Sequence, residues 1–190
     1  MKDIYPWEGD YHRGRDDSSI AVVTLNEKLS FDEEKVAIWG KMKTENLGIE
    51  KVIANVISNP YIRYIIVCGN EIRGHKSGRS LLALYENGID EKGRIKDSPG
   101  AVPYIENIDE KAVKRFREQV EMIDMIGTVD KVNIEKKIDS TLKEKIEPFG
   151  EPYIAIKIKK KKESKFEADM ALHSNLKVSP WGDIENMEEK

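Results

Sequence analysis

The chain has 190 residues, of which 39% are hydrophobic and 35% are charged, and its formal net charge is -3 at pH 7. This length allows one sizeable core, so we expect one domain with less structured termini. The near balance of 32 basic and 35 acidic residues argues against a protein that coats nucleic acid, and no nucleic-acid partner is expected. A lone cysteine, Cys68, excludes an internal disulfide and fits a reducing cytoplasm. No apolar window approaches the ~18 residues of a membrane span, and the N-terminus lacks a signal-peptide pattern.

Apolar runs alternate with amphipathic stretches in the first part of the chain. Short apolar runs between polar residues are typical of strands buried on both faces, while apolar residues three and four positions apart indicate helices. Ser30 and Glu33 fit a capping box, and Asn59-Pro60 is a helix stop. We therefore predict, in chain order, an irregular aromatic-rich arm at 1–19, a strand at 20–25, a helix at 32–42, a helix at 49–57 and a strand at 64–68.

The second part of the chain is predicted by the same patterns. Two prolines and a glycine within residues 98–105 exclude a central strand, so this apolar segment is expected to lie against the core or a ligand. A period of two near residue 155 indicates a half-exposed edge strand. We predict, in chain order, a helix at 77–85 ending at Asn87-Gly88, a loop at 89–101, a helix at 106–121, a strand at 122–129, a helix from 130 or 133 to about 146, the edge strand at 153–159 and a poorly ordered charged tail at 161–190.

This order of elements predicts an α/β protein. Apolar strands separated by helices favour a mostly parallel sheet with helices on both faces. We therefore expect a Rossmann-like three-layer fold over residues 20–160, with the edge strand near its C-terminus.

A histidine framed by glycines follows the predicted strand at 64–68. His75 lies between Gly74 and Gly78, directly before the helix that is predicted to begin near residue 77. In open parallel sheets, ligands bind outside the carboxyl ends of the strands, at turns of this kind. We therefore expect His75 to stand at the ligand-binding edge of the sheet.

Neutral imidazole is a ligand for cobalt, zinc, copper and iron, and it is also a general base near neutral pH. The other histidines, His12 and His173, lie near opposite ends of the chain, which disfavours a site built from three histidines. A single histidine ligand is useful when a corrin or haem ring supplies the remaining metal ligands. The alternative is an exposed histidine at the start of a helix, without a function.

Several blocks of the sequence resemble the A subunit of tetrahydromethanopterin S-methyltransferase, the corrinoid carrier of that complex. The blocks are residues 40–55, 58–64, 68–78 and 103–107, and the resemblance extends over about residues 18–145. It implies a bound cobalamin-type cobamide with His75 as the axial ligand of cobalt and the catalytic centre. The other cofactor-binding residues that it implies are Thr44, Glu45, Asn46, Leu47, Gly69, Gly74, Gly78, Pro99, Gly100, Ala101, Val102, Pro103, Tyr104 and Ile105.

The residue that orients the imidazole stays open at this point. Other corrinoid-binding domains carry the signature Asp-x-His-x-x-Gly, in which an acidic residue stands two positions before the histidine. Here Arg73 occupies that position, and Glu71 stands four positions before His75. Thr44, Glu45 and Asn46 are expected to bind the amide side chains of the corrin, whereas Val102 and Ile105 are expected to cover its ring.

The resemblance also implies an activity and partners. Family members move a methyl group from methyl-tetrahydromethanopterin to cobalt and then to coenzyme M, with separate donor and acceptor subunits and coupling to sodium transport. The family member has a C-terminal membrane anchor, whereas this chain ends in an acidic stretch, so we expect a cytoplasmic, soluble relative. Two alternatives are a protein that stores or delivers corrinoid without methyl transfer, and a nucleotide site in which Lys76 and the helix N-terminus hold phosphate.

Overall fold

The computed structural model describes residues 4–143, 145–155, 176–178 and 184–186. The chain divides into two compact units, Met1–Lys157 and Ile158–Lys190. In the second unit, β6 (Leu176–Val178) pairs with β7 (Ile184–Asn186) in antiparallel fashion. The first unit carries the α/β fold.

A five-stranded sheet in the order β1-β3-β2-β4-β5 forms the centre of the first unit. The edge strand β1 runs antiparallel to β3, and all other neighbours are parallel. The strands are β1 (Tyr11–Arg13), β2 (Ile20–Val23), β3 (Ile38–Gly40), β4 (Tyr64–Gly69) and β5 (Glu121–Ile126). The predicted strands at 20–25, 64–68 and 122–129 are therefore confirmed, each with bounds shifted by one to three residues.

The central strands are apolar on both sides because each side of the sheet carries its own layer of packing. In β4, Ile65 and Val67 join one core cluster, whereas Ile66 and Cys68 join the cluster on the opposite face. Successive side chains of a strand point to opposite faces, so a continuous apolar run is the sequence of a doubly covered strand. Cys68 is fully buried, in agreement with its interpretation as a small hydrophobic residue.

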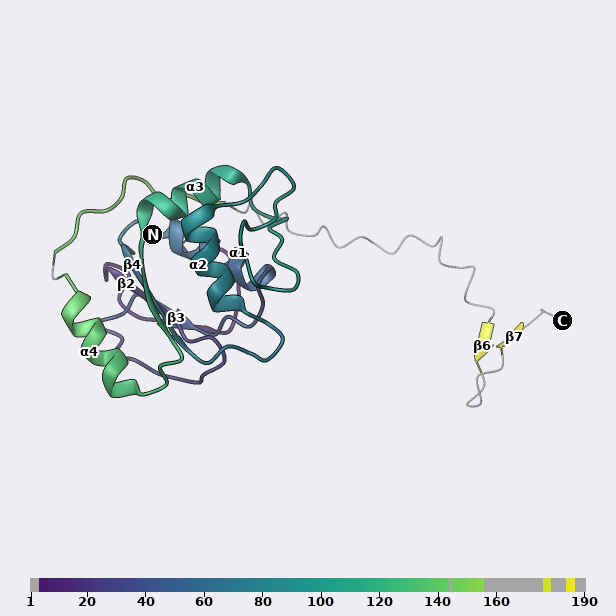
Figure 1. Cartoon of the computed structure of the whole chain (residues 1–190), viewed down its shortest axis with the longest axis horizontal. Helices are drawn as coiled ribbons and strands as arrows, with labels where there is room; N and C mark the ends of the chain where they lie inside the picture. The colour runs from purple at the N-terminus through teal and green to yellow at the C-terminus, as the bar shows by residue number, and fades with distance from the viewer. Residues whose placement is uncertain (1–3, 144, 156–175, 179–183, 187–190) are drawn as a thin grey trace. The chain divides into compact units, whose positions relative to one another are not determined.

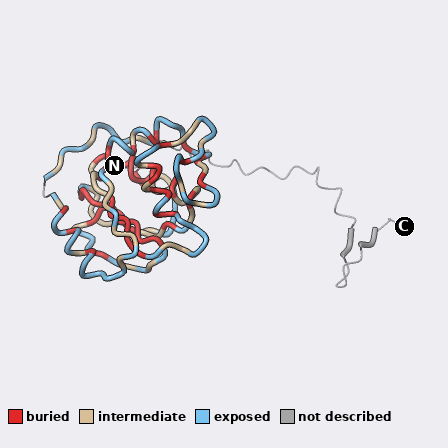
Figure 2. The backbone as a smooth tube through the Cα atoms, in the orientation of Figure 1, coloured by how far each residue is buried: buried red, intermediate tan, exposed pale blue. Residues whose placement is uncertain are grey.

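Four helices complete the three layers. They are α1 (Leu47–Ser58), α2 (Ser77–Asn87), α3 (Glu110–Gln119) and α4 (Lys131–Thr141). The first three pack against one face of the sheet and α4 packs against the other, as Figure 1 shows. The buried residues gather on the strands and on the inner sides of these helices (Figure 2). The predicted mostly parallel α/β fold is confirmed.

The helix predicted at 32–42 is wrong. This segment holds a turn and then β3, whose register is fixed by two strands far away in sequence. The amide of Ala37 donates to the carbonyl of Ile20, and a side chain at Gly40 would lie 2.4 Å from the carbonyl oxygen of Asp10. Pairing with both neighbours therefore overrides the helical pattern of the isolated stretch.

The N-terminal residues are more regular than predicted. The expectation of an irregular arm is wrong for Tyr11–Arg13, which form β1, although the ring of Tyr5 does pack into the core as expected. The predicted helix at 106–121 begins later, at Glu110, where the Asp109 side chain accepts from the amide of Ala112.

The predictions for the C-terminal part of the chain are tested only in part. The helix predicted to reach residue 146 ends at Thr141. Residues 153–155 are not a strand, and the rest of the predicted edge strand lies outside the described residues. Most of the predicted tail also lies outside them.

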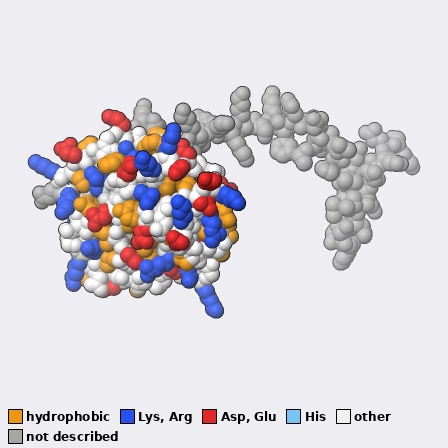
Figure 3. Space-filling model, turned by 45° about the horizontal axis from the view of Figure 1, so that its top comes forward, with side chains coloured by type: hydrophobic (Ala, Val, Ile, Leu, Met, Phe, Trp, Pro, Cys, Tyr) orange, Lys and Arg blue, Asp and Glu red, His pale blue; other side chains and the backbone are white. Residues whose placement is uncertain are grey.

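Two surface properties bear on function. Within the part of the chain that the structure describes, no helix is both long and apolar enough to cross a membrane. On the face drawn in Figure 3, lysine and arginine side chains are interspersed with aspartate and glutamate. That face therefore offers mixed charge to a partner.

Candidate functional site

The candidate site lies at the carboxyl ends of β3 and β4, where two loops meet. The loop after β3 leads into α1, and the loop after β4 leads into α2. The chain leaves β4 at Gly69, whose φ is +87° and where a side chain would lie 2.4 Å from the carbonyl oxygen of Thr24. Only glycine combines this backbone conformation with such a close approach.

Glu45 and His75 meet across the two loops. The Oε2 atom of Glu45 lies 2.9 Å from Nδ1 of His75, although the residues are 30 positions apart in the sequence. The two side chains differ sharply in burial, because that of Glu45 is 2% exposed and that of His75 is 49% exposed. A buried carboxylate thus holds one edge of an imidazole that is open to solvent.

The second oxygen of Glu45 binds a third segment, the loop that follows the long connection after α2. Oε1 accepts from the backbone amides of Ala101 at 3.0 Å and Val102 at 3.1 Å. A side chain at Gly100 would lie 2.7 Å from Cγ of Glu45, so this loop packs tightly on the carboxylate. Burial disfavours the charged form, but hydrogen bonds from the backbone amides of Glu45 and Val102 and from His75 hold the pKa of Glu45 below its ordinary value.

This arrangement fixes the chemistry of the imidazole. An ionised carboxylate has only acceptor positions, so Nδ1 of a neutral His75 must donate its proton to Glu45. Nε2 then keeps its lone pair on the opposite, exposed edge of the ring. Such an atom can bind a metal or accept a proton from a ligand at the surface.

Two exposed apolar residues flank the pair. Leu47 is 45% exposed and begins α1, two positions after Glu45, and Val102 is 54% exposed and hydrogen-bonds to Glu45 through its amide. Large apolar side chains at the surface are noteworthy where they gather around a polar group. Together they offer an apolar floor to a large, flat ligand.

Several residues predicted to bind the cofactor are engaged locally. The Thr44 hydroxyl accepts from the amide of Gly48, and the Asn46 side chain accepts from the amide of Leu47, so both cap α1. Gly78 packs inside α2, where a side chain would lie 3.0 Å from Leu25. Gly74 has φ +85° with open space around it.

The predicted segment from Pro99 to Ile105 divides into two parts. Its first part reaches the His75 site through Glu45, as described above. In the second part, Pro103 and Ile105 hydrogen-bond to the turn at residues 93–95, and Tyr104 forms a bridge with Arg94. Ile105 is 5% exposed and belongs to the core, so it presents little surface to a ligand, unlike Val102.

The partner of His75 is the feature that sequence reasoning missed. Glu71, the nearest acidic residue before the histidine, instead accepts from the amides of Gly78 and Arg79 at the start of α2. That bond also occupies the helix N-terminus at which the nucleotide alternative placed a phosphate. Glu45 itself is predicted at the same edge of the sheet, but nothing in the local pattern singles it out as the partner.

The described residues hold no group of three or more His, Cys, Asp and Glu side chains that could bind a metal ion. His12 lies on β1, where its ring stacks on Trp39 with 5.3 Å between the ring centroids. A metal at His75 would therefore need most of its ligands from a bound group.

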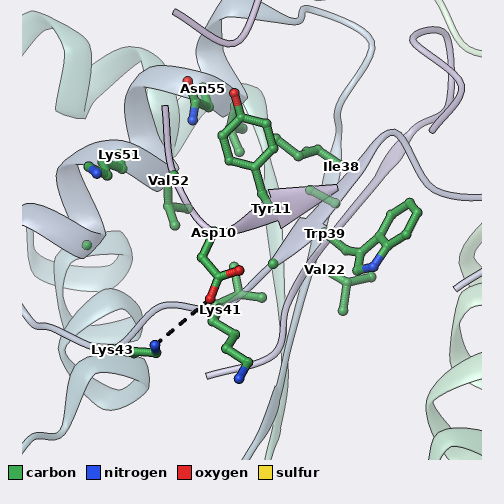
Figure 4. Close-up of a pocket in the computed structure, with 16 residues that line it drawn as sticks. Asp10, Tyr11, Val22, Ile38, Trp39, Lys41, Lys43, Lys51, Val52 and Asn55 are labelled. Atoms are coloured by element: carbon green, nitrogen blue, oxygen red, sulfur yellow. Dashed lines mark ion pairs between the residues drawn. The ribbon is translucent and has the colours of Figure 1, made fainter. Parts of the chain in front are cut away.

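A separate pocket lies between β1, β3 and α1 (Figure 4). Tyr11, Ile38 and Val52 line it, and an ion pair of 3.9 Å between Lys43 and Asp10 lies beside it. Its volume of about 190 Å³ is smaller than the ~300 Å³ typical of pockets for drug-sized ligands. The pocket is therefore too small to enclose a corrin ring, which leaves the open surface around His75 as the place for one.

Comparison with known proteins links this site to methyl transfer. The family model for the A subunit of tetrahydromethanopterin S-methyltransferase matches residues 2–166. The A subunit of the putative methyltransferase Mtx from Methanosarcina acetivorans is 52% identical over 161 residues, which cover 85% of this chain and 81% of that protein. The A subunit of tetrahydromethanopterin S-methyltransferase from Methanosphaera stadtmanae is 43% identical over 171 residues, covering 88% of this chain and 68% of that protein. The form of the same subunit numbered 2 in Methanothermobacter thermautotrophicus is 49% identical over 133 residues, covering 68% and 73%.

Proposed function

Because the chain belongs to the family of the A subunit of tetrahydromethanopterin S-methyltransferase and is thus part of a methyltransferase, we propose that it binds a corrinoid and carries methyl groups between partner subunits. The resemblance found in the sequence is confirmed by these comparisons. One component of a multi-subunit enzyme acts together with the others, so a methyl donor site and an acceptor site on partner proteins are part of the proposal.

The single observation that carries the proposal is the exposed imidazole of His75, with its Nδ1 atom held by Glu45 at 2.9 Å. Nε2 of His75 would be the axial ligand of cobalt, and the exposed side chains of Leu47 and Val102 would support the apolar face of the ring. A bound corrinoid supplies a cobalt atom that accepts a methyl group and passes it on. The protein binds and orients this group through its own residues.

The methyl donor and acceptor are proposed from the family name. We take methyl-tetrahydromethanopterin as the donor and coenzyme M or a similar thiol as the acceptor, since the name specifies transfer to sulfur. The Methanosarcina relative is named only a putative methyltransferase. An assay of the purified chain with each donor and its partner proteins distinguishes these substrates.

The test of corrinoid binding is reconstitution of the full chain with cobalamin, followed by visible spectroscopy. We expect the wild-type protein to show the spectrum of a corrinoid with a histidine as axial ligand, and His75→Ala to lose that signature. His12→Ala is the matched control, because His12 stacks on Trp39 at β1 and should leave the spectrum unchanged. An unchanged histidine-ligated spectrum in His75→Ala overturns the proposal.

A storage protein without methyl transfer is the main alternative. It would bind corrinoid equally well, so the spectrum alone does not separate the two functions. Methylation of the bound cobalt by a partner methyltransferase does separate them, because a store has no need to expose the cobalt face. Binding without methylation by any partner protein would favour storage.

A further inference from the structure

We propose that Glu45 is the positioning residue of His75: its carboxylate selects the Nδ1–H form of the imidazole and couples the orientation of the ring to the loop Ser98–Val102. The inference rests on the proposed function where it concerns corrinoid binding. The part that concerns the imidazole itself depends only on this chain.

The first step is the burial of a carboxylate whose hydrogen bonds come from the backbone and from one imidazole. Glu45 is 1% exposed, and its contacts within hydrogen-bond distance are the backbone amides of Ala101 and Val102 and the ring of His75. Burial of a carboxylate is costly unless its oxygens are hydrogen-bonded. Each of these bonds therefore stabilises the charged side chain, and loss of one affects the others.

The second step is the direction of the proton. Which nitrogen of a neutral imidazole carries the proton is set by the hydrogen bond that the ring makes. Glu45 accepts at Nδ1, so the exposed Nε2 of His75 keeps its lone pair before any ligand arrives. The site is then pre-organised for a metal that approaches from the open edge of the ring.

The third step is the coupling to the loop. The Ser98 hydroxyl donates to the Ser80 hydroxyl of α2 and accepts from the amide of Gly100, and Gly100 packs against Glu45. A rotation of the Glu45 carboxylate that follows the imidazole would break its bonds to the loop amides. His75 and the loop that carries the exposed Val102 therefore move together or not at all.

The two roles can be separated by one substitution. In Glu45→Gln, the amide oxygen can still accept from Ala101 and Val102, but the NH₂ group faces Nδ1 of His75 and can only donate to it. We expect the variant to keep the loop and to reverse the tautomer of His75 to Nε2–H. Glu45→Ala should lose both, because it removes all acceptors.

The experiment is nuclear magnetic resonance of the full chain without corrinoid, labelled with ¹⁵N in histidine, at about pH 8 where imidazole is neutral. Long-range correlations between ring protons and nitrogens identify the tautomer. We expect Nδ1–H as the main form of His75 in the wild type and Nε2–H in Glu45→Gln. Glu71→Gln is the matched control, since Glu71 caps α2 and should leave the tautomer unchanged.

The amide spectrum reports folding and the loop in the same samples. If Glu45→Ala fails to fold, Glu45→Gln alone decides the question, because it is nearly the same size and keeps an acceptor. A wild-type protein with Nε2–H as the main form of His75 overturns the inference. So does a folded Glu45→Gln variant that keeps Nδ1–H.

Cobalamin titration provides the second arm. Removal of a residue that orients a metal ligand lowers metal affinity by about 10- to 100-fold. We expect a loss of this size in Glu45→Gln and none in Glu71→Gln. Equal affinity of Glu45→Gln and wild type overturns the positioning role, whereas a wild type that binds no cobalamin overturns the proposed function and leaves the tautomer result standing.

Discussion

Single buried carboxylates organise the loops around the site. Glu45 and Glu50 are both 1% exposed, and each accepts from two consecutive backbone amides of the segment after residue 98. Glu45 binds Ala101 and Val102, whereas Glu50 binds Glu106 and Asn107. Charged acceptors make stronger hydrogen bonds than neutral ones, so two side chains suffice to hold both ends of a segment that has no regular structure of its own.

Cys68 illustrates a residue whose burial controls its reactivity. Burial in β4, with a smaller effect from the charge of Glu27, raises the pKa of the Cys68 thiol from 9.0 to about 12. We expect iodoacetamide at pH 8 to modify the native chain about two or more orders of magnitude more slowly than the unfolded chain, since only the thiolate reacts. Mass spectrometry measures this directly because the chain has one cysteine. Equal rates would contradict the burial of Cys68.

The same shift has a consequence for stability at high pH. The folded pKa of Cys68 lies above the unfolded one, so its contribution to stability is complete below about pH 9 and is lost as the pH rises toward 12. The Tyr5 hydroxyl behaves in the same direction, because burial raises its pKa from 10.0 to about 12. Both groups therefore favour unfolding in alkali and have no such effect at neutral pH.

At the scale of elements, α1 connects the core to the site. Its apolar face packs in the core with Ile49 and Ile53, while Glu50 on the same helix reaches the segment before α3. The helix begins directly after Glu45, and the caps formed by Thr44 and Asn46 fix where its first turn starts. A shift of this helix would therefore move Glu45 and the loops that depend on it.

Glu50→Ala tests this connection. The amides of Glu106 and Asn107 would lose a buried charged acceptor, so we expect the free energy of unfolding to fall by about 2 to 4 kcal/mol. Chemical denaturation measures the loss, and hydrogen exchange at the two amides shows whether the segment opens locally. Glu106→Ala in the same segment removes an exposed side chain and should change stability by less than about 0.5 kcal/mol. A similar small change in Glu50→Ala would contradict the role of this carboxylate.

The elements that sequence patterns predict well are those with strong local signals. The periodic apolar residues of α1 and the continuous apolar run of β4 lead to the observed elements within two residues. The pattern around the three-residue strand β3 wrongly predicts a helix, because the register of this strand depends on β1 and β2, which are distant in sequence. Short strands carry too few residues for periodicity to distinguish them from a helical turn.

At the scale of the whole molecule, parallel topology explains why the site is predictable in outline. Loops that follow neighbouring parallel strands meet at one edge, so His75 and the segment containing Glu45 are expected together there. The bond between them depends on how two irregular loops fold against each other, and no spacing rule connects residues 30 positions apart. The edge of the sheet is thus a property of sequence patterns, whereas the pairing within it is a property of packing.

The division of the chain into two units leads to a prediction for truncation. Within the described residues, both core clusters and all contacts of Glu45 and His75 lie in the unit Met1–Lys157. A chain that ends at Lys157 should therefore unfold within about 3 °C of the full chain, which corresponds to less than about 1 kcal/mol. It should also give the same His75 tautomer and the same cobalamin affinity. Calorimetry and the measurements described above check these expectations.

Removal of a shorter piece from the other end is the control. A chain that begins at Gly14 lacks β1 and the buried ring of Tyr5, although it loses only 13 residues. Loss of the strand that pairs with β3 exposes an edge of the sheet and part of the core, so we expect the unfolding temperature to fall by more than about 5 °C. If the C-terminal truncation had the larger effect instead, residues 158–190 would stabilise the domain. The assignment of the fold and the site to the first unit alone would then be wrong.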